Sequence, residues 1–266
     1  MDVIGLVLAA GYGTRSLRSL GVEKQRLRIH GVPLVCYPLA ALVSAGVTRL
    51  YIAASAQTRG YIAEYSRECG VDAELVLVPE PWRGNGYTLL YSLAAIASRG
   101  SLEWIIVAMS DHIVHPDMAR IMVHALDDTR KHLYVVLADR RPRFVDYREA
   151  TKLRLGPDGN ILEAGKGLEH ADAVDTGVHA VRPSLAGLLN KVYTVEIIDM
   201  VNLLARHGMS GAVTGVDGAP WIDVDGYEDL YSVECGHARI VPRISLDDSI
   251  LPASLHSHEV ECNGWG

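Results

Sequence analysis

The sequence has few of the features that mark membrane-embedded, secreted or nucleic-acid-binding proteins. Its 266 residues carry a net charge of −7, so broad attraction to a nucleic-acid backbone is not available to it. The longest apolar stretch, residues 32–47, is too short to cross a bilayer and contains two prolines. The first residues lack the basic start and cleavage site of a secretory signal. We therefore expect a cytoplasmic protein that neither binds nucleic acid nor inserts into a membrane.

Cysteine, lysine and glutamine are scarce. The four cysteines form no Cys-x-x-Cys pair, which argues against a zinc ribbon or a redox pair. We expect reduced packing residues at Cys36, Cys69, Cys235 and Cys262. The chain has only two glutamines, and its 20 arginines far outnumber its 5 lysines. This composition suits a thermophile, although a GC-rich genome also favours arginine.

Two common nucleotide-binding glycine loops are missing as well. A dinucleotide fingerprint needs a third glycine where Ser16 stands, and an acidic residue at the end of the second strand, where residues 52–55 are Ile, Ala, Ala and Ser. A phosphate loop of the Walker type needs Gly-Lys-Ser/Thr, and no such tripeptide occurs. A phosphate site in this chain must therefore be of another type.

The N-terminal apolar run ends in small residues followed by two cations. Small residues let backbone N–H groups approach a phosphate chain closely, and Arg15 and Lys24 follow within reach of its oxygens. We predict a strand leading into a triphosphate-binding loop, with Arg15 and Lys24 as catalytic cations. The alternative is a glycine-rich turn with solvated charges. The nucleotide-binding residues predicted in this loop are Leu8, Ala9, Ala10, Gly11, Gly13 and Thr14.

Strand-like and helix-like segments alternate through the first half of the chain. The expected strands cover residues 3–9, 49–54, 74–78, 103–109 and 133–138, and the expected helices cover 35–44, 59–68, 86–98 and 116–127. This alternation predicts an α/β fold with a mainly parallel central sheet flanked by helices. Ligands bind beyond the carboxyl ends of such strands, where the glycine loop and residues 110–112 both arrive.

The pattern changes after residue 139. Short runs at 151–155 and 160–164 flank a Gly-Pro-Asp-Gly turn and predict a β-hairpin, followed by a strand at 173–181, a helix at 195–207, a strand ending near residue 216 and a segment at 221–225. We expect one domain over residues 1–230. Its nucleotide-binding half would cover 1–138 and its acceptor-binding and metal half 139–230, with a helix end and surface tail over 231–266.

Three aspartates are candidates for metal binding. Asp111 ends an apolar strand, where it must meet a cation or cap the helix that begins at Pro116. Asp223 and Asp225 lie on one face of an extended segment. Because Mg²⁺ prefers carboxylate and phosphate oxygens, we predict Asp111 and Asp223 as its ligands. Asp225 is the alternative second ligand, unless it caps the helix starting at Tyr227.

Further polar segments are expected to hold the base and an acceptor. Asn85 and Gly86 open a helix after the third strand and, with Ser110, would extend the nucleotide site, although a plain turn with a helix cap explains them equally well. Cations between residues 139 and 166 suit an anionic acceptor such as a phosphomonoester, and a solvated basic face is the alternative. The predicted acceptor-binding residues are Asp139, Arg141, Arg143, Lys152, Lys166, Asp175, Thr176 and Gly177.

Together these segments resemble the CTP:inositol-1-phosphate cytidylyltransferases of archaea and bacteria, a branch of the sugar-phosphate nucleotidyltransferases. The first loop is general to that superfamily, and the more specific blocks are residues 83–90, 110–112, 139–146, 149–154, 174–177 and 221–225. The resemblance extends to about Leu230. It implies a Rossmann-like nucleotidyltransferase fold, CTP and inositol 1-phosphate as substrates, CDP-inositol and pyrophosphate as products, and Mg²⁺ as cofactor.

Two departures from that family stand out. Relatives usually place proline before the catalytic lysine, whereas this chain has Glu23, which could pair with Lys24 and lower its availability. Many relatives continue into a membrane-embedded domain, so we expect a separate membrane-embedded CDP-alcohol phosphotransferase to consume the product here. A homodimer is compatible with the sequence.

The expected reaction is an in-line attack of the acceptor phosphate on the α-phosphate of CTP. The acceptor supplies its own anionic oxygen, so no protein base is needed. The alternatives are a nucleotidyltransferase for another acceptor, such as a sugar 1-phosphate or phosphocholine, and a non-catalytic nucleotide sensor.

Overall fold

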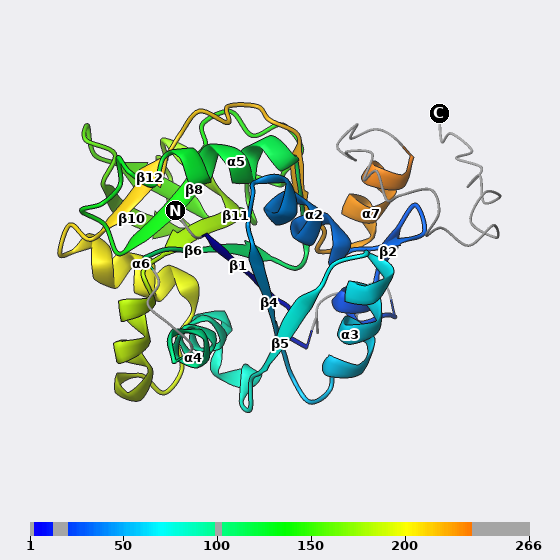
Figure 1. The fold of residues 1–266 in the computed structure, drawn as a ribbon. Coiled ribbons are helices and arrows are strands. Elements are labelled where there is room, and N and C mark those ends of the chain that lie inside the picture. Colours follow the sequence, from blue (N-terminus) through cyan, green and yellow to red (C-terminus); the bar gives the residue numbers. More distant parts are fainter. Residues whose placement is uncertain (1–2, 13–20, 99–102, 236–266) are drawn as a thin grey trace.

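A nine-stranded sheet forms the centre of the protein (Figure 1). The computed structural model describes residues 3–12, 21–98 and 103–235. Seven strands lie in the order β10-β9-β11-β6-β1-β4-β5, β8 pairs with β11, and β12 pairs with β8. The strands are β1 (Ile4–Leu8), β4 (Arg49–Ala54), β5 (Ala73–Leu77), β6 (Ile105–Met109), β8 (Tyr134–Asp139), β9 (Lys152–Leu155), β10 (Ile161–Gly165), β11 (Ala173–Val181) and β12 (Ser210–Val213).

The pairing confirms the predicted α/β class with a mainly parallel sheet. β6, β1, β4 and β5 are parallel neighbours, and β8 and β12 are also parallel. β11 runs against its neighbours, because it lies antiparallel between β6 and β8. The predicted hairpin is present as the antiparallel pair β9 and β10. Through β11, strands from before and after residue 139 share one continuous sheet.

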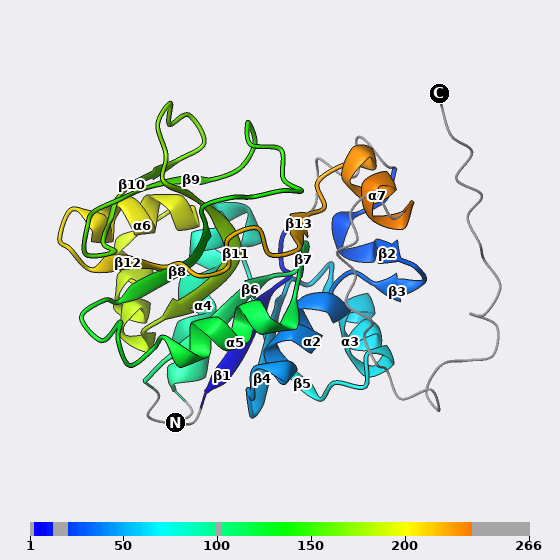
Figure 2. The same ribbon diagram turned by 90° about the horizontal axis from the view of Figure 1, so that it is seen from above.

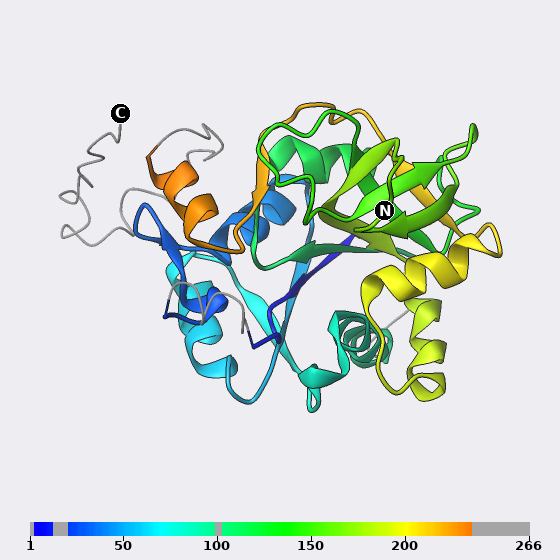
Figure 3. The same ribbon diagram turned by 180° about the vertical axis from the view of Figure 1, so that it is seen from behind.

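Helices cover both faces of the sheet (Figures 1 and 3). One face packs against α2 (Cys36–Ser44), α3 (Arg59–Glu68) and α5 (Pro116–His124), and the other against α4 (Asn85–Ala97), the 3₁₀ helix η3 (Pro183–Lys191) and α6 (Ile197–Ala205). Successive strand residues point to opposite faces, so Val7 of β1 packs with the first group while Leu6 and Leu8 pack with the second. None of the helices in the described ranges has the length and apolar character needed to cross a membrane.

A third, smaller core lies beside the end of β6, where the short segments near the chain's two ends meet (Figure 2). It contains Leu27, Ile113, Ile222 and Val233 among its buried side chains. These residues come from the short segments η1 (Lys24–Arg26), β2 (Arg28–Ile29), β3 (Val32–Pro33), β7 (His112–Val114), β13 (Trp221–Asp223) and α7 (Tyr227–Glu234), or lie next to them. This core brings residues near positions 24, 111 and 223 to one place.

The prediction of reduced cysteines is wrong for Cys36, Cys69 and Cys235, which are disulfide-bonded, and Cys262 lies outside the described residues. Cys36 begins α2, Cys69 follows α3, and the two form a disulfide with a Cα–Cα distance of 5.6 Å. The absence of a Cys-x-x-Cys motif excludes only a disulfide between cysteines that are close in sequence. These two are 33 residues apart and meet because α2 and α3 pack on the same face of the sheet.

We expect the double variant Cys36→Ser/Cys69→Ser to lower the free energy of unfolding by about 3–4 kcal/mol, because a closed loop of this length restricts the unfolded chain. Chemical denaturation of the wild type and the variant without reductant measures the difference. A linked Cys36–Cys69 peptide in mass spectra is the control. Equal denaturation midpoints would show that the bond contributes nothing to stability.

Candidate functional site

The ammonium group of Lys24 lies among three carboxylates. Its Nζ atom is 2.9 Å from Asp111 Oδ2, 3.0 Å from Asp223 Oδ1 and 2.5 Å from Asp225 Oδ1. Lys24 is buried, whereas the three aspartates are partly exposed. His112 completes the cluster, since its Nδ1 is 2.7 Å from Asp111 Oδ1. Lys24 and all three predicted metal ligands therefore meet at one point.

Strand pairing explains how residues so far apart in sequence converge. Asp111 follows the carboxyl end of β6, and the chain then forms β7. β13 pairs antiparallel with β7 in a register that places Asp223 opposite His112, and the Val224 N–H donates to the Asp111 carbonyl. Asp223 is thereby fixed next to Asp111 by backbone hydrogen bonds.

Neither Asp111 nor Asp225 caps a helix with its side chain. His115 is the N-cap of α5, and its Nδ1 accepts from the Asp117 N–H. At α7, Asp229 Oδ2 accepts from the N–H groups of Asp225 and Gly226. The side chains of Asp111 and Asp225 both face Lys24 instead, which excludes the capping alternatives.

Close charges shift the pKa values of the cluster. Burial alone would lower the pKa of Lys24, but the three carboxylates raise it above its usual value. Burial would raise the pKa of Asp111, but Lys24 and His112 hold it well below its usual range. The pKa of His112 rises to about 9 despite burial, because Asp223 and Asp111 favour the charged ring. Asp223 has a raised pKa, caused first by burial and then by the neighbouring carboxylates.

The residues of this cluster fit a divalent cation. Oxygen atoms of three carboxylates surround one position, which Lys24 Nζ occupies here. Oxygen-rich, negatively charged positions of this kind suit Mg²⁺, which also takes phosphate oxygens as ligands. Ligand atoms of Asp111, His112 and Asp223 also lie within 4.8 Å of one another, as a metal site requires. Asp111, Asp223 and Asp225 are the chemically suitable oxygen donors.

Two cavities adjoin the cluster. The larger has a volume of about 420 Å³ and the smaller about 340 Å³. Both are lined in part by the same five residues, Asn85, Met109, Asp111, Glu196 and Asp225. A ligand in each cavity would therefore approach the other at the carboxylate cluster.

The smaller cavity contains much of the predicted nucleotide site. Backbone and side-chain atoms from the end of β1 and from the start of α4 line it, together with Lys24. The predicted residues in this lining are Leu8, Ala10, Gly11, Asn85 and Ser110. Ala9 is buried in the core. Gly13, Thr14 and Arg15 lie outside the described residues.

Glycines let the start of α4 pack closely against the segment before α6. A Cβ atom at Gly86 would lie 2.8 Å from the Val195 and Glu196 carbonyl oxygens, so only glycine fits there. Asn85 Oδ1 accepts from the Ile197 N–H at 2.7 Å. This contact occupies the Asn85 oxygen and leaves its amide NH₂ group as the donor for a ligand.

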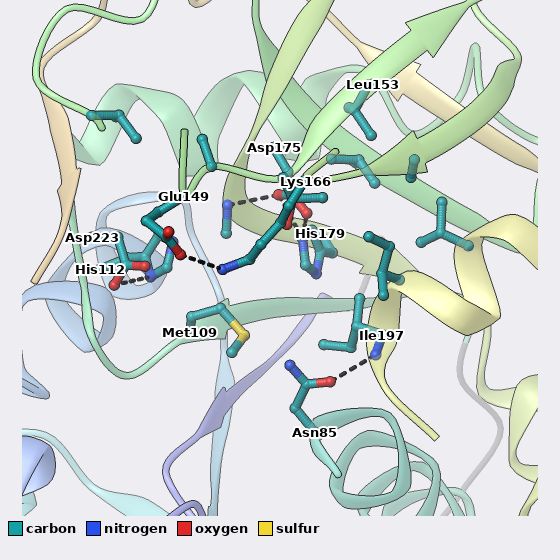
Figure 4. Close-up of a pocket in the computed structure, with 18 of the residues that line it drawn as sticks. Asn85, Met109, His112, Glu149, Leu153, Lys166, Asp175, His179, Ile197 and Asp223 are labelled. Carbon is teal, nitrogen blue, oxygen red and sulfur yellow. Dashed lines mark hydrogen bonds and ion pairs between the residues drawn. The ribbon is translucent and has the colours of Figure 1, made fainter. Parts of the chain in front are cut away.

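The larger cavity contains only part of the predicted acceptor site (Figure 4). Lys166, Asp175 and Gly177 line it, and Lys166 reaches across it towards Glu149. Lys152 instead donates to the Lys166 carbonyl at 2.6 Å, and the Thr176 hydroxyl donates to the Leu137 carbonyl. Five predicted acceptor residues do not belong to the described lining of this cavity: Lys152, Thr176, Asp139, Arg141 and Arg143.

Asp139 has a different place from the one predicted. It is fully buried, and its carboxylate accepts hydrogen bonds from the Trp221 indole N–H at 2.9 Å and from the backbone N–H groups of Arg141 and Gly218. Trp221 in turn stacks on His112, with ring centroids 6.1 Å apart. Asp139 therefore supports the β13 side of the cluster from within the core, and a direct acceptor contact is excluded by its burial.

Glu23 does not form the pair with Lys24 that the sequence left possible. The Glu23 carboxylate accepts from Gln57, Tyr61 and Arg26. These partners turn it away from Lys24, which contacts the aspartates instead. A single residue before a lysine does not reveal which way its side chain turns.

Sequence reasoning missed several residues of the larger cavity. Glu196 lies in both cavities, and its carboxylate accepts from the Asn85 N–H at 3.1 Å. His179 and Trp221 were not predicted to line a site. The motif at 221–225 pointed to Trp221, whereas no local signal marked Glu196 or His179.

The chain is similar to one protein-family model and to several curated proteins. The MobA-like NTP transferase domain family matches residues 5–192. A protein of Archaeoglobus fulgidus called bifunctional IPC transferase and DIPP synthase is 32% identical over 85% of this chain and 42% of its own length. The protein of that name from Thermococcus kodakarensis is 29% identical over 85% of this chain and 48% of its own length. This chain thus spans about half the length of these curated relatives.

Solved structures show the same fold. The inositol-1-phosphate CTP transferase from T. maritima superimposes with a TM-score of 0.75 at 21% identity, covering 87% of this chain and 94% of the other. At this identity the likeness concerns the fold alone.

Proposed function

Because the chain belongs to the MobA-like NTP transferase family, we propose that it transfers the cytidylyl group of CTP to inositol 1-phosphate, giving CDP-inositol and pyrophosphate. The observation that carries this proposal is the pair of cavities that share Asp111 and Asp225. A transfer between two bound substrates needs them to meet at a charged centre, and this arrangement provides one. The names of the relatives and the motif resemblance support the choice of substrates.

In this reaction a phosphate oxygen of the acceptor attacks the α-phosphorus of CTP. The bond from that phosphorus to the bridging oxygen breaks, and pyrophosphate leaves with the electron pair. The nucleotide would occupy the smaller cavity and the acceptor the larger. The anionic acceptor needs no protein base, and Lys24 and Arg15 would offset the charge that develops on the phosphates.

The cluster would hold Mg²⁺ through Asp111 and Asp223, with Asp225 as a further donor. When bound, the ion would neutralise charge on the transferred phosphate. In the larger cavity, Lys166 would bind the acceptor phosphate. The product, a CDP-alcohol, would be the substrate of a membrane-embedded phosphotransferase.

A substrate panel tests the proposal. Pyrophosphate release is measured with each of the four nucleoside triphosphates against inositol 1-phosphate, a sugar 1-phosphate and phosphocholine. We expect CTP with inositol 1-phosphate to be the best pair. Preference for another acceptor would replace the proposed substrate, and tight CTP binding without turnover would indicate a sensor.

The same assay tests the role of the cluster. We expect Asp111→Asn to lower turnover on the order of 10³-fold, because the neutral amide removes a charged ligand and a partner of Lys24. Asp117→Asn is the matched control, since Asp117 is exposed and pairs with Arg120 on α5. Full activity in Asp111→Asn would rule out the proposed metal site.

Lys166 should determine acceptor binding. We expect Lys166→Met to raise the KM for inositol 1-phosphate at least about 10-fold and to leave the KM for CTP unchanged, because Lys166 lines only the larger cavity. Lys131→Met is the control, since Lys131 pairs with Asp158 on the surface. Equal changes in both KM values would contradict a role at the acceptor phosphate.

A further inference from the structure

A chain of three polar side chains runs from the core to the larger cavity. The Tyr134 hydroxyl is 2.8 Å from His179 Nδ1, and His179 Nε2 is 2.9 Å from Asp175 Oδ1. Tyr134 and His179 are buried, while Asp175 and His179 line the cavity (Figure 4). The proposed reaction does not use Tyr134 or His179.

An irregularity in β11 makes this contact possible. Side chains four residues apart in a regular strand lie about 13 Å from each other. Here the register pairs Asp175 with Ala138 but His179 with Val136, so four steps along β11 match two along β8. Gly177 supplies the turn in this bulge with a φ of +75°. The extra length folds Asp175 back onto His179.

The hydrogen bonds fix the proton positions along the chain. A carboxylate only accepts, so His179 Nε2 carries the proton that points to Asp175. His179 Nδ1 then faces the Tyr134 hydroxyl at 2.8 Å. Burial raises the pKa of Asp175, but His179 and the Gly177 N–H outweigh it, so the pKa lies below its usual value. Asp175 therefore presents an ionised carboxylate to the cavity.

One oxygen of that carboxylate remains well placed for a ligand. Asp175 Oδ1 accepts from the Gly177 N–H at 2.8 Å and from His179 at 2.9 Å, whereas Oδ2 has only a longer contact of 3.1 Å with His179 among the described residues. An anionic oxygen repels a phosphate and accepts from a hydroxyl. Lys166 lines the same cavity and suits the phosphate instead.

We propose that Tyr134 and His179 are positioning residues that hold the Asp175 carboxylate so that Oδ2 accepts a hydrogen bond from a hydroxyl of the acceptor. This rests on the proposed function and narrows its acceptor to phosphorylated polyols. A fixed buried acceptor left unpaired penalises ligands that lack the hydroxyl. Phosphocholine, which has a phosphate but no hydroxyl, should therefore be rejected.

Steady-state kinetics on three variants test the proposal. We expect His179→Leu to raise the KM for inositol 1-phosphate about 10- to 100-fold, to leave the KM for CTP unchanged and to reduce discrimination against phosphocholine. His179→Gln keeps a donor for Asp175 and should restore part of the loss. Tyr134→Phe should act in the same direction with a smaller effect, because it removes only the hydroxyl that orients the ring.

Tyr37→Phe is the matched control. Tyr37 is also buried, and its hydroxyl donates to the Ile29 carbonyl in the small core. It should leave the KM for the acceptor and the discrimination unchanged. Tyr134→Phe keeps the ring volume, so it remains informative if His179→Leu does not fold.

The outcomes separate this proposal from the proposed function. If the wild type turns over inositol 1-phosphate but Tyr134→Phe and the folded His179 variants keep its KM and discrimination, the positioning role is wrong and the proposed function stands. If the wild type does not turn over inositol 1-phosphate with any nucleotide, the proposed function itself is wrong.

Discussion

The variant Lys24→Met should lose turnover and at the same time bind Mn²⁺ more tightly than the wild type in the absence of nucleotide. Lys24 Nζ lies within 3.0 Å of Asp111 and Asp223 and contacts Asp225 as well. An ammonium group and a divalent cation cannot both occupy the position between these carboxylates. Lys24 must therefore leave before the carboxylates can take up a cation, and a triphosphate offers it new partners.

We expect Lys24→Met to lower turnover on the order of 10²- to 10³-fold, because a preorganised cation is lost from the phosphate site. We expect its affinity for Mn²⁺ to rise about 10-fold or more, because a competing charge is removed. Electron paramagnetic resonance of free Mn²⁺ measures the affinity without nucleotide.

Lys166→Met is the control, since it removes a positive charge from the larger cavity beside the cluster without contact to the three aspartates in the described structure. Its Mn²⁺ affinity should stay within about twofold of the wild type. An unchanged or weaker Mn²⁺ affinity in Lys24→Met would show that Lys24 does not compete with the cation.

The second large effect is expected from Asp139→Ala, and it concerns stability. Removing this carboxylate leaves the Trp221 indole N–H and the Arg141 and Gly218 backbone N–H groups without their acceptor. Buried donors without partners are costly, and we expect the free energy of unfolding to fall by about 3–5 kcal/mol. Urea denaturation measures this change.

Asp217→Ala is the control for Asp139→Ala, because Asp217 is exposed on the same side of the fold and should change stability by less than about 0.5 kcal/mol. Asp139→Asn keeps one acceptor oxygen, so its loss of unfolding free energy should lie between those of Asp139→Ala and Asp217→Ala. In Asp139→Asn we expect the KM for inositol 1-phosphate to change only slightly, because Asp139 reaches the larger cavity only through its contact with Trp221. A large rise in this KM with unchanged stability would favour the direct acceptor contact predicted from the sequence.

The sequence determined the elements and the chemical character of the site. Hydrophobic period and turn residues placed β4 and α3 with their observed bounds, because both signals are local. The position of Asp111 after a buried strand also pointed to a cation partner, because a carboxylate there is unstable alone. Within the described residues Asp111 pairs with Lys24, which the glycine-loop motif had already marked, and also with His112.

Only the tertiary structure decided how distant segments pair. The antiparallel entry of β11 between β6 and β8 and the bulge at Gly177 place His179 against Asp175, and no local pattern encodes a strand register. Cys36 and Cys69 meet because two helices share one face of the sheet.

The sequence likewise could not show which charged side chains are buried and which are free to contact a ligand. Asp139 and Lys152 belong to a basic, polar stretch that predicted acceptor contacts, yet Asp139 is bonded within the core and Lys152 to a backbone carbonyl. Residue type and spacing determined which groups could react. Their burial and their partners depend on how segments distant in the sequence pack together, as Lys24 and Asp223 do, and this is decided only when the whole chain folds.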